Sequence, residues 1–272
     1  MRRLEGVLRV VMCGVVACSA LACRDIPPPD NEIKNIVILK DAIFARVEHV
    51  GGVRFKEVVL EYFDEQQRIK VRQLILAQEP DELRVQTKLP GTEELVSVLV
   101  SNGERFAMHQ RDSNTYYTGR PTREHINELL PLDLSASDVV RVMLGGAPWE
   151  RFLQEGSPET WALRWDGKTG RYDVSVKTRA GGSLSMQVRH EDFAVVEVRE
   201  RGPRGRLIYA YTTKDWRRYG TASLPEYRRF VWPAKNLDFS LDVGETQVGV
   251  SLPESLFNLP APAGSEVIDL GD

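Results

Sequence analysis

The spacing of apolar residues changes along the chain, and each change predicts a different kind of element. Apolar side chains recur at helical spacing over 32–49, and Gly51-Gly52 follows, so this stretch predicts one amphipathic helix. The apolar period then falls to two as far as residue 108, which is typical of half-buried strands. Turn sequences such as Pro90-Gly91 and Asn102-Gly103 separate these strands and indicate successive hairpins.

The second half of the chain repeats this order of elements. Helical spacing returns over 121–130 and 135–144, with Thr122 and Ser135 as candidate N-caps, and the two-residue period resumes from Trp161. The order helix, meander, two helices, meander favours a large antiparallel sheet curled around inserted helices over parallel βαβ units. Because no Ser/Gly-rich linker interrupts this stretch, we expect residues 33–272 to form a single domain.

The N-terminal residues have the pattern of an export signal. Three arginines precede an uncharged run, Val10–Ala22, which is too short to be a transmembrane helix. Residues 1–22 are therefore predicted to be a lipoprotein signal peptide that the mature protein lacks. The following residues, 23–32, contain Pro27-Pro28-Pro29 and predict an extended tether.

All three cysteines lie in or directly after this signal, so the folded domain has no thiol for a disulfide. The sequence Ser19-Ala20-Leu21-Ala22-Cys23 resembles a lipobox, in which the cysteine is acylated with palmitate-type chains and becomes the new N-terminus. Cys18 is a competing candidate, but a shorter apolar run precedes it. Cleavage as an ordinary signal peptide would instead leave Cys23 as a free thiol, a liability in an oxidising compartment. We favour acylation of Cys23.

Composition and charge narrow the classes of partner. The chain has 42% hydrophobic residues, enough for a full core, and a formal net charge of −3. Removal of residues 1–22 takes away three arginines and one glutamate and leaves −5, so nothing predicts nucleic-acid binding. The basic run 199–206 could dock on an anionic surface, but we interpret it as a solvent-exposed hairpin.

The sequence holds no recognisable catalytic machinery. Its four histidines are scattered without metal-ligand spacing, and it lacks a nucleophile elbow, a phosphate-binding loop and a dinucleotide fingerprint. We therefore expect a protein that is not an enzyme and that needs no metal or other cofactor.

Several separated segments together resemble the LolA/LolB group of lipoprotein-sorting carriers and receptors. In order along the chain they are Glu79-Pro80-Asp81-Glu82-Leu83-Arg84-Val85, Leu89-Pro90-Gly91, Ser101-Asn102-Gly103-Glu104-Arg105-Phe106, 129–148 and 257–264. The resemblance implies a mainly β fold with α-helices, namely an incomplete antiparallel β-barrel covered by helices around an apolar cavity. LolB carries a leucine on a protruding hairpin, where this chain has Leu89 before the proline rather than after it, which puts the role of Leu89 in doubt.

These observations predict binding rather than catalysis. We expect a lipid-anchored protein that faces the periplasm, most simply from the outer membrane, and whose apolar cavity accepts acyl chains, including those of other lipoproteins. In this role we expect the protein to be a monomer. The alternative is a structural or interaction subunit of a cell-envelope complex with no lipid cargo. The large apolar residues that could line the cavity, or equally form ordinary core, are Phe106, Ile126, Leu129, Val140, Leu144, Trp161, Met186 and Phe239.

Overall fold

The computed structural model describes residues 25–63, 68–129 and 133–271, and within these ranges fourteen strands form one sheet. The strands are β1 (Val53–Phe63), β2 (Arg68–Gln78), β3 (Glu82–Lys88), β4 (Leu95–Asn102), β5 (Phe106–Gln110), β6 (Thr115–Gly119), β7 (Ala162–Asp166), β8 (Arg171–Lys177), β9 (Ser183–Arg189), β10 (Val195–Arg201), β11 (Leu207–Tyr219), β12 (Ala222–Trp232), β13 (Leu237–Val248) and β14 (Glu266–Asp269). Their order in the sheet is β14-β6-β5-β4-β3-β2-β1-β13-β12-β11-β10-β9-β8-β7.

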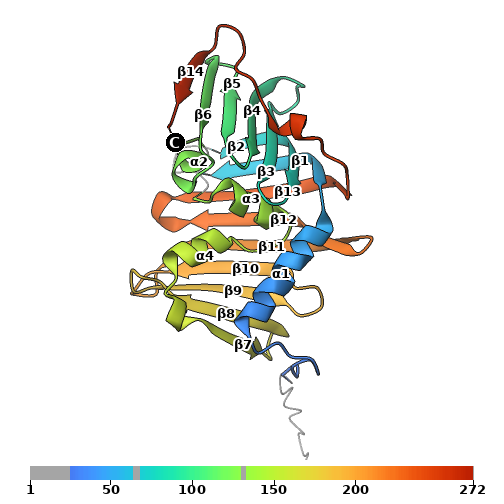
Figure 1. Cartoon of the computed structure of the whole chain (residues 1–272), viewed down its shortest axis with the longest axis vertical. Coiled ribbons are helices and arrows are strands. Elements are labelled where there is room, and N and C mark those ends of the chain that lie inside the picture. Colours follow the sequence, from blue (N-terminus) through green and yellow to red (C-terminus); the bar gives the residue numbers. More distant parts are fainter. Residues whose placement is uncertain (1–24, 64–67, 130–132, 272) are drawn as a thin grey trace, which may run out of the picture.

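Two meanders, β1 to β6 and β7 to β13, meet in the middle of the sheet (Figure 1). They are joined by antiparallel pairing of β1 with β13, in which Leu60 lies opposite Leu241 and Tyr62 opposite Phe239. The last strand, β14, pairs in parallel with β6. Sequence periodicity detects each meander but not this long-range pairing, because periodicity reports which face a residue occupies and not its neighbouring strand.

The first helix, α1 (Ile36–Val50), starts four residues later than the apolar spacing predicts. Asn35 is the N-cap, and its side chain accepts a hydrogen bond from the backbone N–H of Val37. Ile33 lies before the helix, where its backbone N–H donates to the Tyr172 hydroxyl at 3.0 Å. The buried residues of α1 follow helical spacing, whereas the side chain of Val37 is 56% exposed.

Three short helices connect β6 to β7: α2 (Arg123–Leu129), α3 (Ala136–Met143) and α4 (Trp149–Glu155). The first two match the predicted helices, and Ser135 caps α3 as expected. The sequence did not reveal α4, β6 or β14. Three 3₁₀ turns complete the described elements: η1 (Pro158–Thr160), η2 (Pro233–Lys235) and η3 (Glu254–Phe257).

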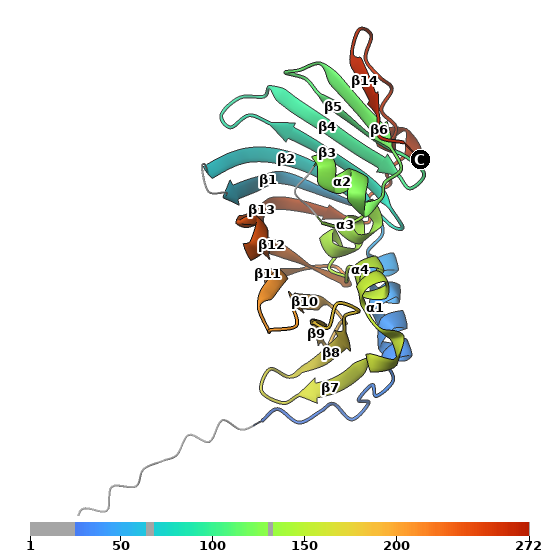
Figure 2. The same ribbon diagram turned by 90° about the vertical axis from the view of Figure 1, so that its left-hand side faces the viewer.

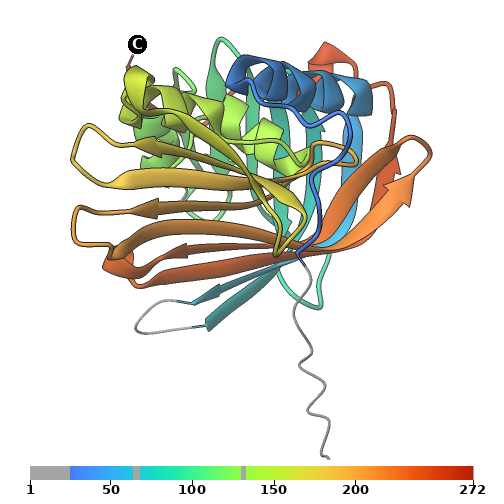
Figure 3. The same cartoon turned by 90° about the horizontal axis from the view of Figure 1, so that it is seen from below.

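The sheet bends around its helices and stays open, as Figure 2 and the view from below in Figure 3 show. The main core lies on the helical side, where the inward residues of both meanders pack against α1, α3 and α4. On the other side the segment after β13 packs on β2 and β4, with Phe257 and Leu252 against Leu76. The predicted architecture, a mainly β fold with an incomplete antiparallel barrel covered by helices, is confirmed.

The chain ahead of α1 lies against the sheet rather than apart from it. The backbone N–H of Ile26 donates to the carbonyl of Gly167 at 2.6 Å, and the indole N–H of Trp165 donates to the carbonyl of Ile26 at 2.9 Å. The predicted signal peptide, Cys18 and Cys23 lie outside the described residues. In the part of the chain that the structure describes, no helix combines the length and apolar character needed to cross a membrane.

Candidate functional site

An apolar cavity of about 100 Å³ lies between α3 and the middle of the sheet. Its walls come from β1, β2, β3, β12 and β13 and its roof from α3. The lining residues are Leu60, Tyr62, Gln73, Ile75, Leu83, Val85, Leu134, Val139, Val142, Met143, Phe230, Phe239 and Leu241.

The strand residues of this lining share one face because successive side chains of a strand point to opposite sides. Leu60 and Tyr62 alternate along β1, and their partners in β13, Leu241 and Phe239, continue the same face. The amide of Gln73 donates to the Thr87 hydroxyl at 3.2 Å, so the polar group of this lining residue is already hydrogen-bonded. Apart from this amide and the hydroxyl of Tyr62, the walls offer a ligand apolar surface.

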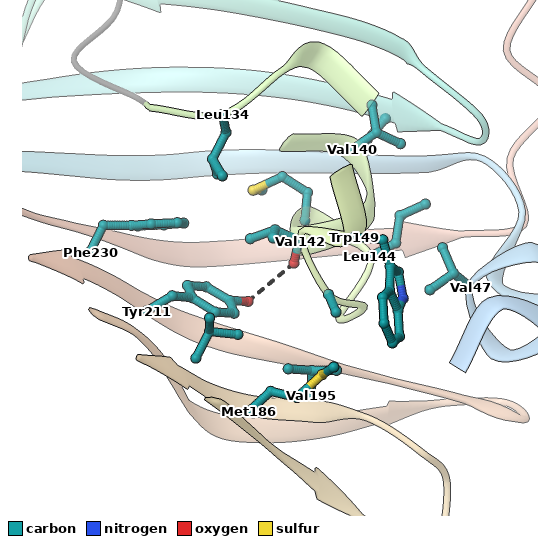
Figure 4. Packing of buried hydrophobic residues seen from close by; sticks show 14 of the residues in the cluster. Val47, Leu134, Val140, Val142, Leu144, Trp149, Met186, Val195, Tyr211 and Phe230 are labelled. Atoms are coloured by element: carbon teal, nitrogen blue, oxygen red, sulfur yellow. Dashed lines mark hydrogen bonds between the residues drawn. The ribbon is translucent and has the colours of Figure 1, made fainter. Parts of the chain in front are cut away.

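The C-terminal end of α3, the helix above the cavity, is held by three donors from other elements. The Tyr211 hydroxyl donates to the carbonyl of Val142 at 3.2 Å (Figure 4). Arg228 donates to the carbonyl of Met143 at 2.6 Å, and Arg46 donates to that of Leu144 at 2.6 Å. These carbonyls carry the negative end of the helix dipole, so two guanidinium groups there stabilise the helix electrostatically.

Burial shapes the ionisation of these donors. It raises the pKa of Tyr211 to about 12, so the hydroxyl keeps its proton and remains a donor. It lowers the pKa of Arg46 to about 10, with Asp192 opposing the shift, and lowers that of Arg228. Arg228 also lies over the ring of Phe55, 5.0 Å from its centroid, which gives the buried guanidinium a favourable cation–π contact.

Two carboxyl groups in or beside α3 have raised pKa values. Asp138 is buried and accepts backbone hydrogen bonds from Glu150 and Arg151, each at 3.1 Å, yet burial raises its pKa to about 6. Burial also raises the pKa of Glu79 to about 7, and the Arg141 guanidinium 3.5 Å away opposes that shift. Because both carboxyl groups lie in or beside α3, we expect the stability of this region to depend on pH near neutrality.

We expect Glu79→Gln to flatten the pH dependence of stability. Because the pKa of Glu79 rises from 4.5 to about 7 on folding, its stabilising contribution is complete below pH 4.5 and is lost as the pH rises through about 7. At pH 8 the variant should be more stable than wild type by about 1–2 kcal/mol, since the group is partly solvated. Urea denaturation over this pH range measures the effect. Glu94→Gln, at an exposed turn, is the control. If the stability of Glu79→Gln varied with pH in the same way as that of wild type, the expectation would be contradicted.

A buried ionic network lies beside α4. Arg151 donates to Glu200 at 3.0 Å and to the Asp133 carboxylate at 3.0 Å, and Arg123 reaches the same aspartate at 2.7 Å. Although desolvation opposes it, pairing with the two arginines lowers the pKa of Asp133 to about 2. Glu200 belongs to the basic run 199–206, so one residue of this run is buried rather than solvent-exposed.

Of the eight predicted lipid-binding residues, Phe239 is among those that line the cavity. Val140 and Leu144 belong to the main core, and their neighbours Val139, Val142 and Met143 supply the cavity surface from the helical segment. Since sequence spacing identifies an inward face but not which part of it is filled, the sequence did not single out these neighbours.

The remaining five predicted residues lie outside this lining. Phe106 and Ile126 are buried on β5 and α2, and Leu129 packs at the end of α2. Trp161 stacks on Trp149 and Phe152, with centroids 5.9 and 5.8 Å apart, and the last, Met186, is buried on β9 in the second meander.

Leu89 directly follows β3 and is 41% exposed, at a turn closed by its backbone N–H donating to Glu94 at 3.1 Å. Leu89 thus lies on the hairpin that joins β3 to β4. In the described ranges no group of three or more His, Cys, Asp or Glu side chains is arranged to hold a metal ion.

Solved structures with the same architecture identify the fold. One, described as an outer membrane lipoprotein-sorting protein domain from Vibrio parahaemolyticus, has a TM-score of 0.56 at 10% identity and covers 82% of this chain and 95% of its own. A LolA superfamily protein from Nitrosomonas europaea has a TM-score of 0.50 at 11% identity, with 81% and 97% covered. The chain has the LolA-like fold.

This LolA-like fold also matches a DUF1329 family protein from Desulfovibrio piger, with a TM-score of 0.57 at 9% identity and coverage of 83% of this chain and 98% of that one. No protein-family model and no curated protein sequence matches the chain. At such low identities the likeness lies in the fold, while the chemistry of the cavity has to be argued from this chain's own residues.

Proposed function

We propose that this protein is a lipid-anchored binding protein that faces the periplasm and holds an acyl chain beneath α3. The observation that carries the proposal is the cavity between α3 and the sheet, whose lining is apolar apart from the hydrogen-bonded Gln73 and the hydroxyl of Tyr62. The likeness to a structure described as an outer membrane lipoprotein-sorting protein domain supports the same class of cargo and an outer-membrane location. Acylation of Cys23 supplies the anchor, and no catalytic step is involved.

The size of the cavity sets the mechanism. About 100 Å³ is well below the 300–1,000 Å³ of typical ligand sites, so an acyl chain enters only if α3 moves away from the sheet. The three hydrogen bonds at the C-terminal end of α3 make that end the pivot, and the segment near Leu134 and Val139 moves. Each methylene that is buried contributes about 0.8 kcal/mol toward this opening.

Filling the cavity tests the proposal. Val139 is half-buried on α3 and lines the cavity, so Val139→Phe occupies its space at little cost in stability. We expect this variant to bind a fluorescent fatty acid at least about tenfold more weakly than wild type, a loss of about 1.4 kcal/mol. Val37→Phe makes the same exchange at an exposed position of α1 and should leave the affinity unchanged.

Equal affinities of the two valine variants would refute binding in this cavity. A wild-type protein that is folded but binds no fatty acid would favour the second candidate function, an interaction subunit of an envelope complex. The small volume of the cavity is the observation that favours this alternative, because a nearly filled core needs no cargo.

A further inference from the structure

The segment that follows the predicted anchor, residues 25–33, is bound to one end of the sheet at the turn between β7 and β8. The β7–β8 turn contains Gly167 and Gly170, and Ile26 lies against both. A Cβ atom at Gly167 would lie 3.0 Å from Asp25 Cβ and 3.2 Å from the Ile26 carbonyl oxygen. One at Gly170, where φ is +66°, would lie 3.1 Å from Ile26 Cδ1. The two glycines thus make room for the incoming chain.

Hydrogen bonds fix the segment on both sides of Pro27-Pro28-Pro29. Ahead of the prolines, the backbone N–H of Ile26 donates to Gly167 and its carbonyl accepts from the Trp165 indole. After the prolines, the backbone N–H of Ile33 donates to the Tyr172 hydroxyl. The proline run therefore spans two attachment points on β7 and β8, instead of holding the domain away from its anchor as a free tether would.

Chain geometry then limits how far the anchor can be from the sheet. Only three residue steps separate Cys23 from Ile26, and an extended chain covers at most about 3.6 Å per residue, so the two Cα atoms are within about 11 Å. Acyl chains on Cys23 enter the hydrocarbon directly beneath a headgroup layer about 5–8 Å thick. Figures 1 and 2 show β7 at one end of the long axis and β14 at the other, so only the β7 end can lie at the headgroups.

The side chains of this end suit a headgroup layer. Ile26 is 46% exposed, Lys168 and Arg164 are exposed, and the half-buried Trp165 ring rests against Tyr172 with its centroid 5.4 Å away. Trp at the interface and Lys or Arg toward anionic lipids are each favourable there. The nearby Asp166 carboxylate is occupied by the backbone N–H of Lys168 at 3.0 Å and the Thr169 hydroxyl at 2.7 Å, while Asp25 remains exposed.

We propose that Ile26, Trp165 and Lys168 form a membrane-contact surface for lipid headgroups, so that the β7 end of the sheet faces the bilayer. This inference rests on the acylated anchor of the proposed function. The lipid-facing end is then fixed by the bound segment 25–33, and the cavity lies farther along the sheet.

Depth measurements on the acylated full-length mature protein in vesicles of phosphatidylglycerol and phosphatidylcholine test this surface. Because the described domain lacks cysteine, Thr169→Cys and Val267→Cys each accept one environment-sensitive fluorophore, the first beside the proposed surface and the second at the distant β14 end. With nitroxide lipids in the bilayer, quenching at position 169 should exceed that at position 267 by about threefold or more. Equal quenching, or stronger quenching at 267, overturns the proposal.

A second variant tests whether the bound segment 25–33 holds the β7 end of the sheet at the membrane. Gly167→Val in the Thr169→Cys background expels Asp25 and Ile26 from the turn, which lengthens the free chain and should lower the quenching at 169 by about twofold. Unchanged quenching would overturn the role of the segment. Mass spectrometry of the N-terminal peptide separates the two proposals: an unmodified Cys23 defeats the anchor itself, whereas an acylated protein without the quenching difference defeats only this inference.

Discussion

Replacing Arg151 by Met should lower the free energy of unfolding by about 3–5 kcal/mol, because the change leaves the buried Glu200 without its cation and removes one of the two cations that pair with Asp133. Arg151 is 2% exposed and joins Glu200 of β10 to Asp133 ahead of α3. Methionine keeps much of the volume, so the effect reports the lost charge rather than a cavity. Urea denaturation followed by tryptophan fluorescence gives the number.

Two comparisons isolate the cause of this loss. Arg199→Met removes a guanidinium paired with Glu197 on the exposed side of β10, and should cost less than about 1 kcal/mol. Adding Glu200→Gln to Arg151→Met should recover part of the lost stability, since it removes the charge that the first change leaves buried and unpaired. Similar losses of stability for Arg151→Met and Arg199→Met would show that the buried network stabilises the fold no more than an exposed ion pair does.

A charge introduced at Leu144 should lower the free energy of unfolding at least as much as Arg151→Met does. Leu144 is fully buried where α3 ends, and Figure 4 shows its side chain beside Trp149 and Val47. Leu144→Glu places a carboxylate among apolar groups and removes apolar contacts, so we expect a loss of about 4 kcal/mol or more and a matching fall in melting temperature. Leu153→Glu, on α4 at 63% exposure, makes the same exchange in solvent and should be nearly neutral.

This pair of leucine variants also separates core from lid. If Leu144 were part of a mobile lid, its charged variant would stay stable and lose only fatty-acid affinity. Thermal melts and fatty-acid titrations on the same samples distinguish the two results. A stable Leu144→Glu protein would contradict the packing around α3 described above.

Much of the fold could be predicted because each local pattern agrees with the final architecture. Period-two apolar residues such as Leu60 and Tyr62 do face the core, and Ser135 does cap a helix. The start of α1 was placed too early because Ile33 continues the apolar spacing, whereas Asn35 supplies the cap that decides where the helix begins. The pairing of β1 with β13 depends on contacts between residues far apart in sequence, which no local pattern encodes.

The candidate site was harder to predict than the fold. Whether an inward residue borders open space depends on how the opposite layer packs, so Val140 and Val142 look equivalent in sequence although only Val142 borders the cavity. The burial of Glu200 inside a basic run was equally hidden, since its partner Arg151 comes from a helix that the sequence did not reveal.

An open sheet also has to remain soluble at its two edges. In the described part of the chain β14 and β7 end the sheet, and an unpaired edge is a template for strands of another molecule. Both strands are short, β14 carries Glu266 and Asp269, and β7 carries the exposed Arg164. Addition of a foreign strand would bury these charges, so short charged edges oppose aggregation and allow the sheet to stay unclosed.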